Sequence, residues 1–578
     1  MLRHILSTPI ARTLLVTTIV TTLCQAAPAA ERPLGAARGM VVSVTAEGSD
    51  AGLDVLRRGG NAVEAAVATA FALAVTHPAA GNVGGGGFMM VHPGRGRPPV
   101  CVEYRETAPA RATVRMFEKD LRMDGHKVSG TPGTVAGLAL AHKQYGKLPW
   151  RDLVMPAVRL ARDGFVVNKP LADSLNGVLQ STKMFAEFQR VFAPPRGRTK
   201  WQPGDRLVQP ELARTLDQIA AGGPDAFYRG PIADQIVAEM IAGRGLITKK
   251  DLAAYRANVR EPIRGTYRGY DVFGAPPPSS GGICLVLMLN ILENFDLGGQ
   301  PEPASGADRP VPWSPRTMHL VIESMRRAYC DRARHLGDPD FTKIPAHLTT
   351  KEYAKKLAAQ IDLAKATPSQ AIAPDITLAP ESESTTHFSV IDKDGMAVAN
   401  TYTLENAYGS RVVVRGAGFL LNNEMTDFNR IPGRTDRKGT IGTPANLVAP
   451  GKRMLSSQTP TLVCRDDRPV LVTGSPGGRT IINTVLCTVV SFVDFHLDSR
   501  QAVDAPRLHH AWFPDRVGFE GFKRPEYAQT VEQLRSMGHQ FDEKARRQGD
   551  AHSIGVDPST GRFLGAADKR SDGKAAGY

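Results

Sequence analysis

The pattern of apolar and polar residues from 38 to 80 predicts a strand followed by two helices. Ser49 can serve as the N-cap of the first helix. Asn61 and Glu64 have the spacing of a capping box, and they open the alanine-rich segment 62–75, which is apolar nearly all round. Because a helix without a polar face must be buried, we expect 62–75 to pack against a sheet.

A run of glycines between Gly81 and Gly87 follows this helix and precedes the apolar strand 88–91. A phosphate-binding loop has the opposite order, with the strand before the glycines and a helix after them. The run therefore argues against a nucleotide site. We expect these glycines to let backbone segments pack closely.

The segment from about 107 to 380 is mostly helical in pattern. The expected helices are 131–145, 150–164, 210–221, 231–242, 283–292 and 315–336. A polar stretch with prolines, 366–384, then predicts an exposed connection.

Beyond residue 385 the pattern becomes rich in strands. Two strands, 387–391 and 396–403, flank Asp394-Gly395, which is typical of a hairpin turn. A hairpin centred near Asp394 brings Thr403 nearly opposite Thr385. Opposed threonines are common in sheets, so this pairing alone does not make either residue reactive.

Elements on both sides of residue 385 favour an α/β protein with sheets between helical layers. The later strands are expected near 418–421, 460–464 and 469–473, and the later helices at 480–495 and 529–537. The chain has no internal repeats.

Composition and charge change this picture little. The 578 residues are 42% hydrophobic and 22% charged, as in a globular protein. A net charge of +14 raises the question of nucleic-acid binding. The basic residues are scattered, however, and the aromatic content is 6%, so we expect a basic enzyme without a nucleic-acid partner.

Residues 1–30 have the organisation of a secretory signal peptide. Arg3 and Arg12 precede the apolar run 13–23, and small residues follow it. The run is shorter than the roughly 20 residues that a membrane span needs. Cys24 suggests a lipoprotein, but Leu23 stands where a small residue is required. We expect ordinary cleavage and an exported protein, periplasmic or extracellular.

Five cysteines remain after the signal segment, an odd number without CxxC spacing: Cys101, Cys284, Cys330, Cys464 and Cys487. Neither a disulfide framework nor a zinc site is indicated. Most lie among apolar residues, so we expect buried side chains, and we expect no structural metal.

Several motifs resemble γ-glutamyltranspeptidases, in the order in which that family has them. The resemblance runs from about residue 36 to 578. It is carried by Gly81–Phe88, Tyr104-Arg105-Glu106, Thr385–Val390, Asp392–Gly395, Asn422–Phe428, Leu455-Ser456-Ser457, Gly474–Gly478 and the terminal Ala576-Gly577-Tyr578.

The resemblance implies a four-layer αββα sandwich of the N-terminal nucleophile hydrolase type, formed jointly by two segments of one precursor. Residues 31–384 would be the large subunit and 385–578 the small catalytic subunit of one heterodimer. Self-cleavage between Ser384 and Thr385 would make Thr385 the nucleophile. Its free α-amine, with an ordinary pKa near 7.7–8.0, would then be the adjacent base.

The resemblance also implies how a γ-glutamyl group is held. Arg105, helped by the hydroxyls of Ser456 and Ser457, would grip the α-carboxylate; a surface ion pair between Arg105 and Glu106 is the alternative. Glu424 and Asp427 match the positions that bind the α-ammonium. Glu405 stands nearby, where many members have Asn, although three acids can also form a solvated face.

Two loops complete the implied site. Gly477 and Gly478, between a strand and a helix, would stabilise an oxyanion, whereas without the other motifs they would indicate only a tight turn. The segment 432–455 matches a lid loop. It is basic through Arg434, Arg437 and Lys438, and it lacks the aromatic residue of some relatives.

The implied reaction is transfer of the γ-glutamyl group of glutathione or related compounds, through an ester on Thr385, to water, amino acids or dipeptides. No cofactor is required. One alternative is a related acylase that removes glutaryl-type side chains from β-lactams. The other is an unprocessed homologue that only binds γ-glutamyl compounds. Thr403 would orient Thr385 in the enzymatic interpretation.

Overall fold

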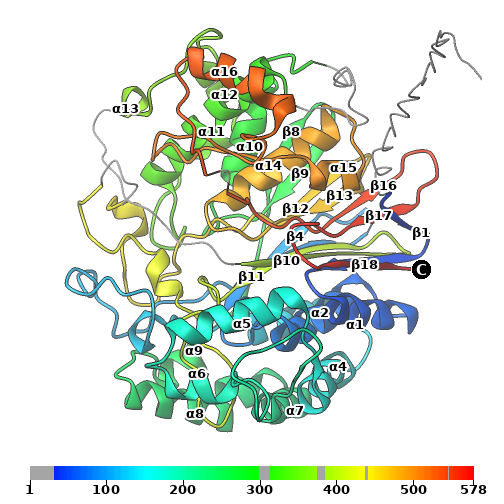
Figure 1. Ribbon diagram of the computed structural model, residues 1–578, viewed down its shortest axis with the longest axis vertical. Helices are drawn as coiled ribbons and strands as arrows, with labels where there is room; N and C mark the ends of the chain where they lie inside the picture. Colours follow the sequence, from blue (N-terminus) through cyan, green and yellow to red (C-terminus); the bar gives the residue numbers. More distant parts are fainter. Residues whose placement is uncertain (1–31, 95, 299–312, 374–384, 436–440, 545) are drawn as a thin grey trace, which may run out of the picture.

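Two antiparallel seven-stranded sheets stack face to face in the computed structural model, which describes residues 32–94, 96–298, 313–373, 385–435, 441–544 and 546–578 (Figure 1). The first sheet has the order β18 (Lys574–Gly577), β2 (Gly39–Ser43), β10 (Thr386–Asp392), β11 (Ala397–Thr403), β3 (Gly86–His92), β4 (Val100–Glu103) and β7 (Asn258–Arg260). The second has the order β1 (Leu34–Ala36), β17 (Phe563–Ala566), β16 (Ser553–Val556), β13 (Arg468–Thr473), β12 (Thr461–Arg465), β9 (Tyr270–Gly274) and β8 (Ile263–Tyr267).

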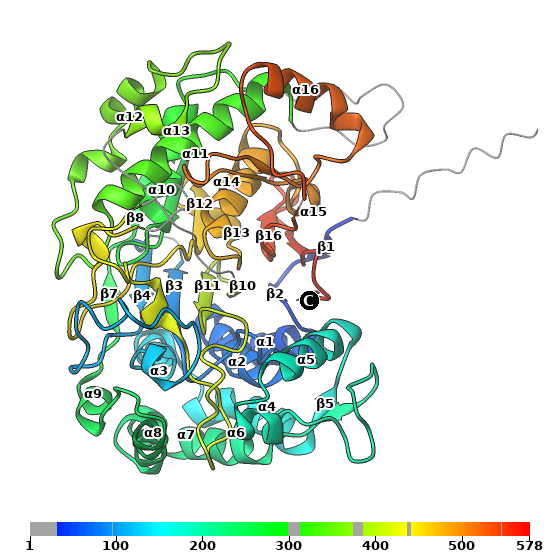
Figure 2. The same ribbon diagram turned by 60° about the vertical axis from the view of Figure 1, so that its left-hand side comes forward.

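A helical layer covers the outer face of each sheet, so the predicted αββα order is confirmed (Figures 1 and 2). Below the first sheet lie α1 (Ala46–Arg57), α2 (Ala62–Thr76), α3 (Thr134–Tyr145), α4 (Trp150–Asp163), α5 (Lys169–Ser181), α7 (Pro210–Tyr228) and α8 (Pro231–Ala242). Above the second lie α10 (Gly281–Leu292), α11 (Pro315–His335), α12 (Lys351–Ala358), α14 (Thr480–Val493), α15 (Ser499–Asp504) and α16 (Ala528–Ser536).

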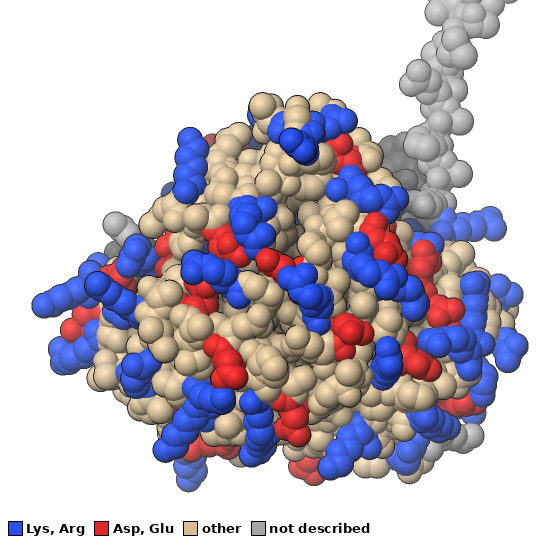
Figure 3. All heavy atoms as spheres, turned by 90° about the horizontal axis from the view of Figure 1, so that it is seen from below, with Lys and Arg blue, Asp and Glu red and all other residues tan. Residues whose placement is uncertain are grey.

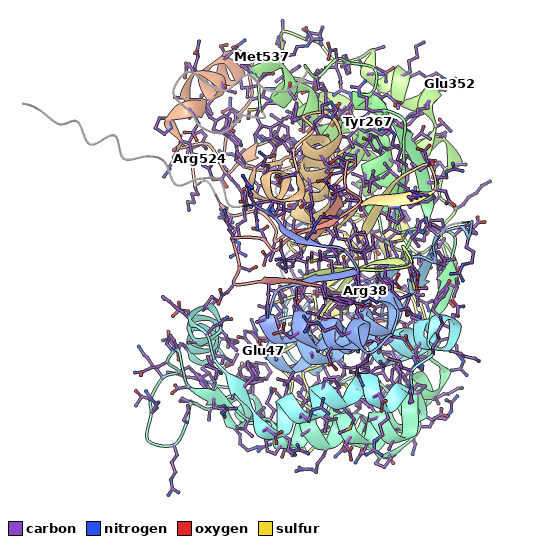
Figure 4. All side chains as sticks on the ribbon, turned by 90° about the vertical axis from the view of Figure 1, so that its right-hand side faces the viewer. Arg38, Glu47, Tyr267, Glu352, Arg524 and Met537 are labelled. Carbon is purple, nitrogen blue, oxygen red and sulfur yellow. The ribbon has the colours of Figure 1, made fainter. Side chains whose placement is uncertain are left out.

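Three apolar cores separate these four layers. Alternation along β10 divides its side chains between two of them: Phe388 and Val390 pack toward the helices, whereas Ile391 packs between the sheets. A third core joins the second sheet to its helices. Figure 4 shows the side chains that fill the layers, with Tyr267 in that third core and Glu47 at the start of α1 on the opposite side of the sheets.

The buried helix α2 forms as predicted. Asn61 and Glu64 make the reciprocal hydrogen bonds of a capping box, and every residue of the helix is buried. The predicted cap of α1 is wrong. Thr45, four residues before Ser49, accepts the capping N–H of Gly48, because Ser49 is turned into the interior and donates to the carbonyl of Lys574 at 2.8 Å.

Both sheets are shared between the segments before and after residue 385. In the first sheet, β10 and β11 lie between β2 and β3. In the second, β12 and β13 lie between β9 and β16. The strands of the two segments are hydrogen-bonded to one another throughout, and the described chain ends at the edge strand β18 (Figure 1).

Most predicted helix bounds agree with the structure within three residues. The helix predicted at 210–221 continues to Tyr228, across a kink at Gly223, whose φ is +61°. The strand predicted at 418–421 is wrong, since Leu420 makes only an isolated bridge to Val413 and Gly418 has a φ of +74° that interrupts extended backbone.

Two further corrections concern the segment before residue 385. The hairpin β8–β9 was missed, although Arg268 and Gly269 at its turn both have positive φ, as a type I′ turn requires. The predicted exposed connection, 366–384, is partly wrong. Ser369 is fully buried and donates to the carbonyl of Trp512, while residues 374–384 lie outside the described part of the chain.

The five cysteines are all buried, as predicted. Burial raises the pKa of the Cys284, Cys464 and Cys487 thiols to about 12, so they remain protonated. Cys24 and the rest of the expected signal segment lie outside the described residues.

The charged residues are intermixed on the face that Figure 3 shows, where lysines and arginines alternate with acidic residues. Within the described residues, no helix combines the length and apolar character that crossing a membrane requires. On the face in Figure 3, the basic residues are scattered among acidic ones.

Candidate active site

The hairpin of β10 and β11 has the predicted register. His387 pairs with Thr401 and Thr386 with Tyr402, so the next pair in line is Thr385 with Thr403. Asp392 organises the turn, because its Oδ1 accepts the N–H groups of residues 394 and 396. Thr385, the first described residue after the connection, is half-buried at the end of a central strand.

One face of β10 is directed at the second sheet. Ser389 Oγ donates to the carbonyl of His552 at 2.8 Å and lies 3.3 Å from the carbonyl oxygen of Val472 on β13. Two residues earlier, the His387 imidazole lies against Gly474, where an added Cβ would be 2.4 Å from the ring. Burial, and then the charge of His552, hold the pKa of His387 well below its usual value, so its ring is neutral.

The glycine run allows close backbone packing, as predicted. A Cβ on Gly85 would lie 2.0 Å from the carbonyl oxygen of Thr403, and one on Gly87 would lie 2.4 Å from that of Thr401. A Cβ on Gly86 would meet the Glu106 carboxyl at 2.7 Å. The run thus brings β11 and the segment after β4 close together at the end of the sheet where β10 begins.

Arg105 follows β4 and is 1% exposed, so it is not the surface residue of the alternative interpretation. Its Nη1 lies 2.5 Å from Glu424 Oε2 and 3.5 Å from Glu106 Oε2, and its Nη2 donates to Asp427. Burial alone would lower the pKa of this guanidinium, but the charges of Glu424, Asp427 and Glu106 raise it above its usual value.

Burial shifts the pKa of two of the acids around Arg105 in the same direction. Burial raises the pKa of Glu106 to about 8, against the opposing effect of Arg105. Burial also raises the pKa of Glu424 well above its usual range, with Glu106, Asp427 and Glu405 acting in the same direction, whereas the adjacent Arg105 lowers it and favours the carboxylate. The structure brings Glu405, Glu424 and Asp427 together at one site, as the sequence predicts. Glu405 and Glu424 are buried and Asp427 is half-buried, so the three do not form a solvated acidic face.

Glu405 is connected to the hairpin through its backbone. Its N–H donates to Thr403 Oγ1 at 2.8 Å. Its backbone φ of +78° is rare for residues other than glycine, asparagine and aspartate. Asn423 Nδ2 donates to Glu405 Oε2 at 2.8 Å and so fixes the carboxylate. Asn423 was not predicted as a site residue. Its position beside Glu424 in the same short motif was the available signal.

Ser456 and Ser457 are both buried. Ser456 Oγ accepts the N–H of Gln458 at 3.1 Å, and Ser457 Oγ accepts from Arg332 Nη2 at 2.9 Å. A hydroxyl that accepts an N–H keeps its own proton for donation, so each serine can still donate to a carboxylate. Arg332, which also donates to Ser280, is a second residue that the sequence did not predict.

Gly477 and Gly478 form the turn between β13 and α14, as predicted. Their φ values are +129° and +55°, which glycine adopts readily. The turn ends at the start of α14, where the N–H of Thr480 donates to the Gly477 carbonyl. Because Gly474 lies against His387, this turn comes to the same end of the stacked sheets as Thr385.

The base of the predicted lid, 432–455, is tied to the acidic site. Asn446 Nδ2 donates to the carbonyl of Asp427 at 2.7 Å, and Asn446 Oδ1 accepts the N–H of Leu455 at 2.9 Å. Arg434 is described, whereas Arg437 and Lys438 lie outside the described residues. The described part of the loop thus runs from beside Asp427 to the serine pair.

A cluster with metal-binding composition lies at α11, where His319, Glu323 and His539 come together. The two rings bond to each other, Nδ1 to Nε2, at 2.8 Å. Glu323 forms ion pairs with Arg326 and Arg327, both buried. These contacts make a buried hydrogen-bond network, and the nearby guanidinium groups oppose a divalent cation.

Two antiparallel sheets between helical layers, with a threonine opening a central strand, define the class of N-terminal nucleophile hydrolases. The profile of the gamma-glutamyltranspeptidase family matches residues 48–578, and the chain belongs to that family. It is accordingly an enzyme that transfers or hydrolyses γ-glutamyl groups.

Individual relatives support this assignment. A glutathione hydrolase proenzyme of Escherichia coli (strain K12) is 47% identical over 555 residues, covering 94% of this chain and 93% of that protein. One of Pseudomonas sp. (strain A14) is 42% identical over 587 residues, covering 98% and 99%. The crystal structure of a cephalosporin acylase from Bacillus halodurans has a TM-score of 0.80 and 28% identity, covering 96% and 98%.

Proposed function

We propose that the chain cleaves itself between Ser384 and Thr385, and that Thr385 then attacks the γ-glutamyl amide of glutathione and related compounds. Ser384 lies outside the described residues, so the support comes from Thr385 itself. It stands at the end of a central strand, beside Thr403 and at the edge where Arg105 and its acidic partners gather.

The stacking of β10 on β13 supports an oxyanion role for the glycine turn. Ser389 is level with Val472, and His387 is level with Gly474. Moving two residues toward the start of β10 therefore corresponds to moving two residues toward the end of β13. The next residues in this series are Thr385 and Pro476, so Thr385 would lie beside the N–H groups of Gly477 and Gly478.

The charges of the site suit the two ends of a γ-glutamyl group. The guanidinium of Arg105 and the hydroxyls of Ser456 and Ser457 would hold the α-carboxylate. Glu405, Glu424 and Asp427 would hold the α-ammonium. Without substrate, Arg105 and the acids neutralise one another, so a zwitterion can replace internal ion pairs with equivalent external ones.

The reaction then has two balanced steps. The free α-amine of Thr385 takes the proton of its Oγ as that oxygen bonds to the γ-carbonyl carbon, and the proton passes to the departing amine, which for glutathione is cysteinylglycine. Water or the amine of an amino acid or dipeptide next attacks the ester. The Thr385 oxygen recovers a proton, and glutamate or a new γ-glutamyl compound leaves. None of these steps calls on a cofactor.

Cleavage would leave residues 31–384 and 385–578 as the two subunits of a heterodimer. The hydrogen bonds between their strands within both sheets support a lasting association after the cut. The signal-like segment 1–30 supports export to the periplasm or beyond.

The observation that carries this proposal is the ion-pair cluster of the buried Arg105 and Glu424 with the half-buried Asp427, beside the strand that Thr385 opens. The test is to incubate the purified enzyme with a γ-glutamyl anilide and to measure both released aniline and the mass of the small subunit. A transient gain of one γ-glutamyl group on the peptide containing Thr385 is expected. Turnover without any such adduct under rapid quench would contradict the proposal.

Two alternatives are separated by the same assay. A glutaryl-type acylase is suggested by the cephalosporin acylase with the same fold, and it would prefer a glutaryl anilide, which lacks the ammonium. The acidic cluster opposes that preference. A homologue that only binds γ-glutamyl compounds would stay in one piece and release no aniline from either compound.

A further inference from the structure

The glycine turn is held from outside by a segment near the C-terminus. Asp550 donates its backbone N–H to Ser475 Oγ at 2.8 Å, and Ser475 Oγ donates to the carbonyl of Pro476 at 2.7 Å. Ser475 is fully buried. Its hydroxyl therefore links the turn to residues 548–551, which we name the strap.

Gly549 of the strap is packed directly on the turn. A Cβ on Gly477 would lie 3.2 Å from Gly549 Cα, and a Cβ on Gly549 would lie 2.4 Å from Ser475 Oγ. The same Cβ would lie 2.6 Å from Oγ1 of Thr484 on α14. The strap thus fills the space that the turn would otherwise be free to enter.

Buried charged groups anchor both ends of the strap. Gln548 donates its N–H to Glu520 at 2.8 Å and accepts from Arg507 Nη1 at 2.6 Å. At the other end, the N–H of Ala551 donates to Asp568 Oδ2 at 2.7 Å. Arg507 is also paired with Asp568, and both are buried. Because both of its ends are fixed by hydrogen bonds, the strap can restrict the movement of the flexible Gly477–Gly478 turn.

We propose that the strap sets the positions of the Gly477 and Gly478 N–H groups, so that Ser475 and Gly549 are positioning residues for turnover. This inference rests on the oxyanion role proposed above. Two consecutive glycines with positive φ resist displacement weakly. Oxyanion donors must nevertheless lie about 2.7–3.1 Å from the position of the developing charge. The strap supplies the constraint that the glycines lack.

Ser475→Ala and Gly549→Ala test the proposal. The first removes the acceptor of the Asp550 N–H, and the second forces Ser475 away. In the cleaved enzyme, each is expected to lower kcat for a γ-glutamyl anilide by about tenfold or more, with KM changed by less than about twofold. A role confined to folding would leave kcat per folded, cleaved molecule unchanged.

Two matched controls isolate the effect. Gly561 has a φ of +69°, close to the +64° of Gly549, but a Cβ there meets nothing within 4 Å. Gly561→Ala thus reproduces the backbone strain without touching the turn. Ser499→Ala removes another hydroxyl, on α15, that donates to a backbone carbonyl at 2.7 Å. Both controls are expected to keep the kcat of the wild type.

The kinetic constants of the variants, compared with those of the controls, support or overturn the proposal. Kinetic constants equal to those of the controls, or a loss confined to KM, would overturn the proposal. A folded variant that stays uncut while the controls are cut would also overturn it, because the strap would then act on self-cleavage and not on turnover. Should Gly549→Ala not fold, Ser475→Ala, which deletes a single oxygen atom, carries the test. Failure of the proposed function itself would instead appear as absent turnover in the wild type.

Discussion

The guanidinium of Arg105 lies 2.5 Å from the carboxylate of Glu424, and both side chains are buried. A buried ion pair of this kind is costly to break from one side, since the remaining charge has no compensation. The pair also offers a positive and a negative group at fixed positions, where a zwitterion can bind in one orientation. The cation and the anion can each exchange their internal partner for the opposite end of a zwitterion.

Replacing Arg105 by lysine tests whether the guanidinium binds the carboxylate of the donor. Lysine keeps the charge but cannot bridge Glu424 and Asp427 with a planar fork, so KM for γ-glutamyl donors is expected to rise about tenfold or more. Arg264→Lys is the control, since that arginine forms an exposed pair with Asp271. Steady-state kinetics that give the same KM for both variants would contradict the assignment.

Glu405→Asn tests how the acids select an ammonium. Because one negative charge is removed beside Glu424, the preference for a γ-glutamyl over a glutaryl anilide is expected to fall by about three- to tenfold in kcat/KM. Glu352→Gln removes a charge from the exposed helix α12 and is the control (Figure 4). An unchanged preference in Glu405→Asn would show that Glu405 does not act on the ammonium.

The raised pKa of Glu106 predicts that the stability of the folded protein depends on pH. Its pKa is raised from 4.5 to about 8 in the folded protein, so between these values the folded state binds the extra proton and the unfolded state does not. Stability therefore falls as pH rises through this window, by on the order of 1 kcal/mol per pH unit. Glu106→Gln removes the effect.

The measurement for Glu106 is the midpoint of thermal unfolding from pH 5 to pH 8. The variant is expected to gain stability relative to the wild type as pH rises, and to differ least at the acidic end. A constant difference across this range would mean that the carboxyl titrates normally.

Gly85 and Gly177 give opposite predictions for the same substitution. A Cβ on Gly85 would lie 2.0 Å from the Thr403 carbonyl, so Gly85→Ala must displace β11 and is expected to lower both stability and activity. Gly177 lies within α5 with no atom near its missing Cβ. Gly177→Ala is expected to stabilise by about 0.5–1 kcal/mol. Thermal unfolding and turnover check both, and equal effects would contradict the packing argument.

Much of the fold follows from local signals in the sequence. The capping box at Asn61 and Glu64, the apolar character of 62–75 and the Asp-Gly turn at 394–395 each specify structure through neighbouring residues. The hairpin register is of this kind, since a turn fixes which residues pair. The wrong cap at Ser49 is a tertiary effect, because its hydroxyl bonds to Lys574, far away in the chain.

The site was only partly accessible from the sequence. Arg105, Glu424 and Asp427 could be named from motifs, but their mutual ion pairs depend on the glycine run that draws the strands together. Arg332 and the strap escaped prediction for the same reason. Their hydrogen bonds to Ser457 and Ser475 join residues that are 125 and 75 positions apart in the chain, and no local spacing encodes such contacts.

The most direct test of the central claim is the intact mass and N-terminal sequence of the purified protein, with Thr385→Ala beside it. The proposed enzyme gives two fragments, and the smaller begins Thr385-Thr386-His387. Thr385→Ala should stay in one piece with an unchanged fold, because its first residue after the connection lacks the attacking oxygen. A wild-type chain that remains uncut yet releases amine from γ-glutamyl compounds would contradict the account.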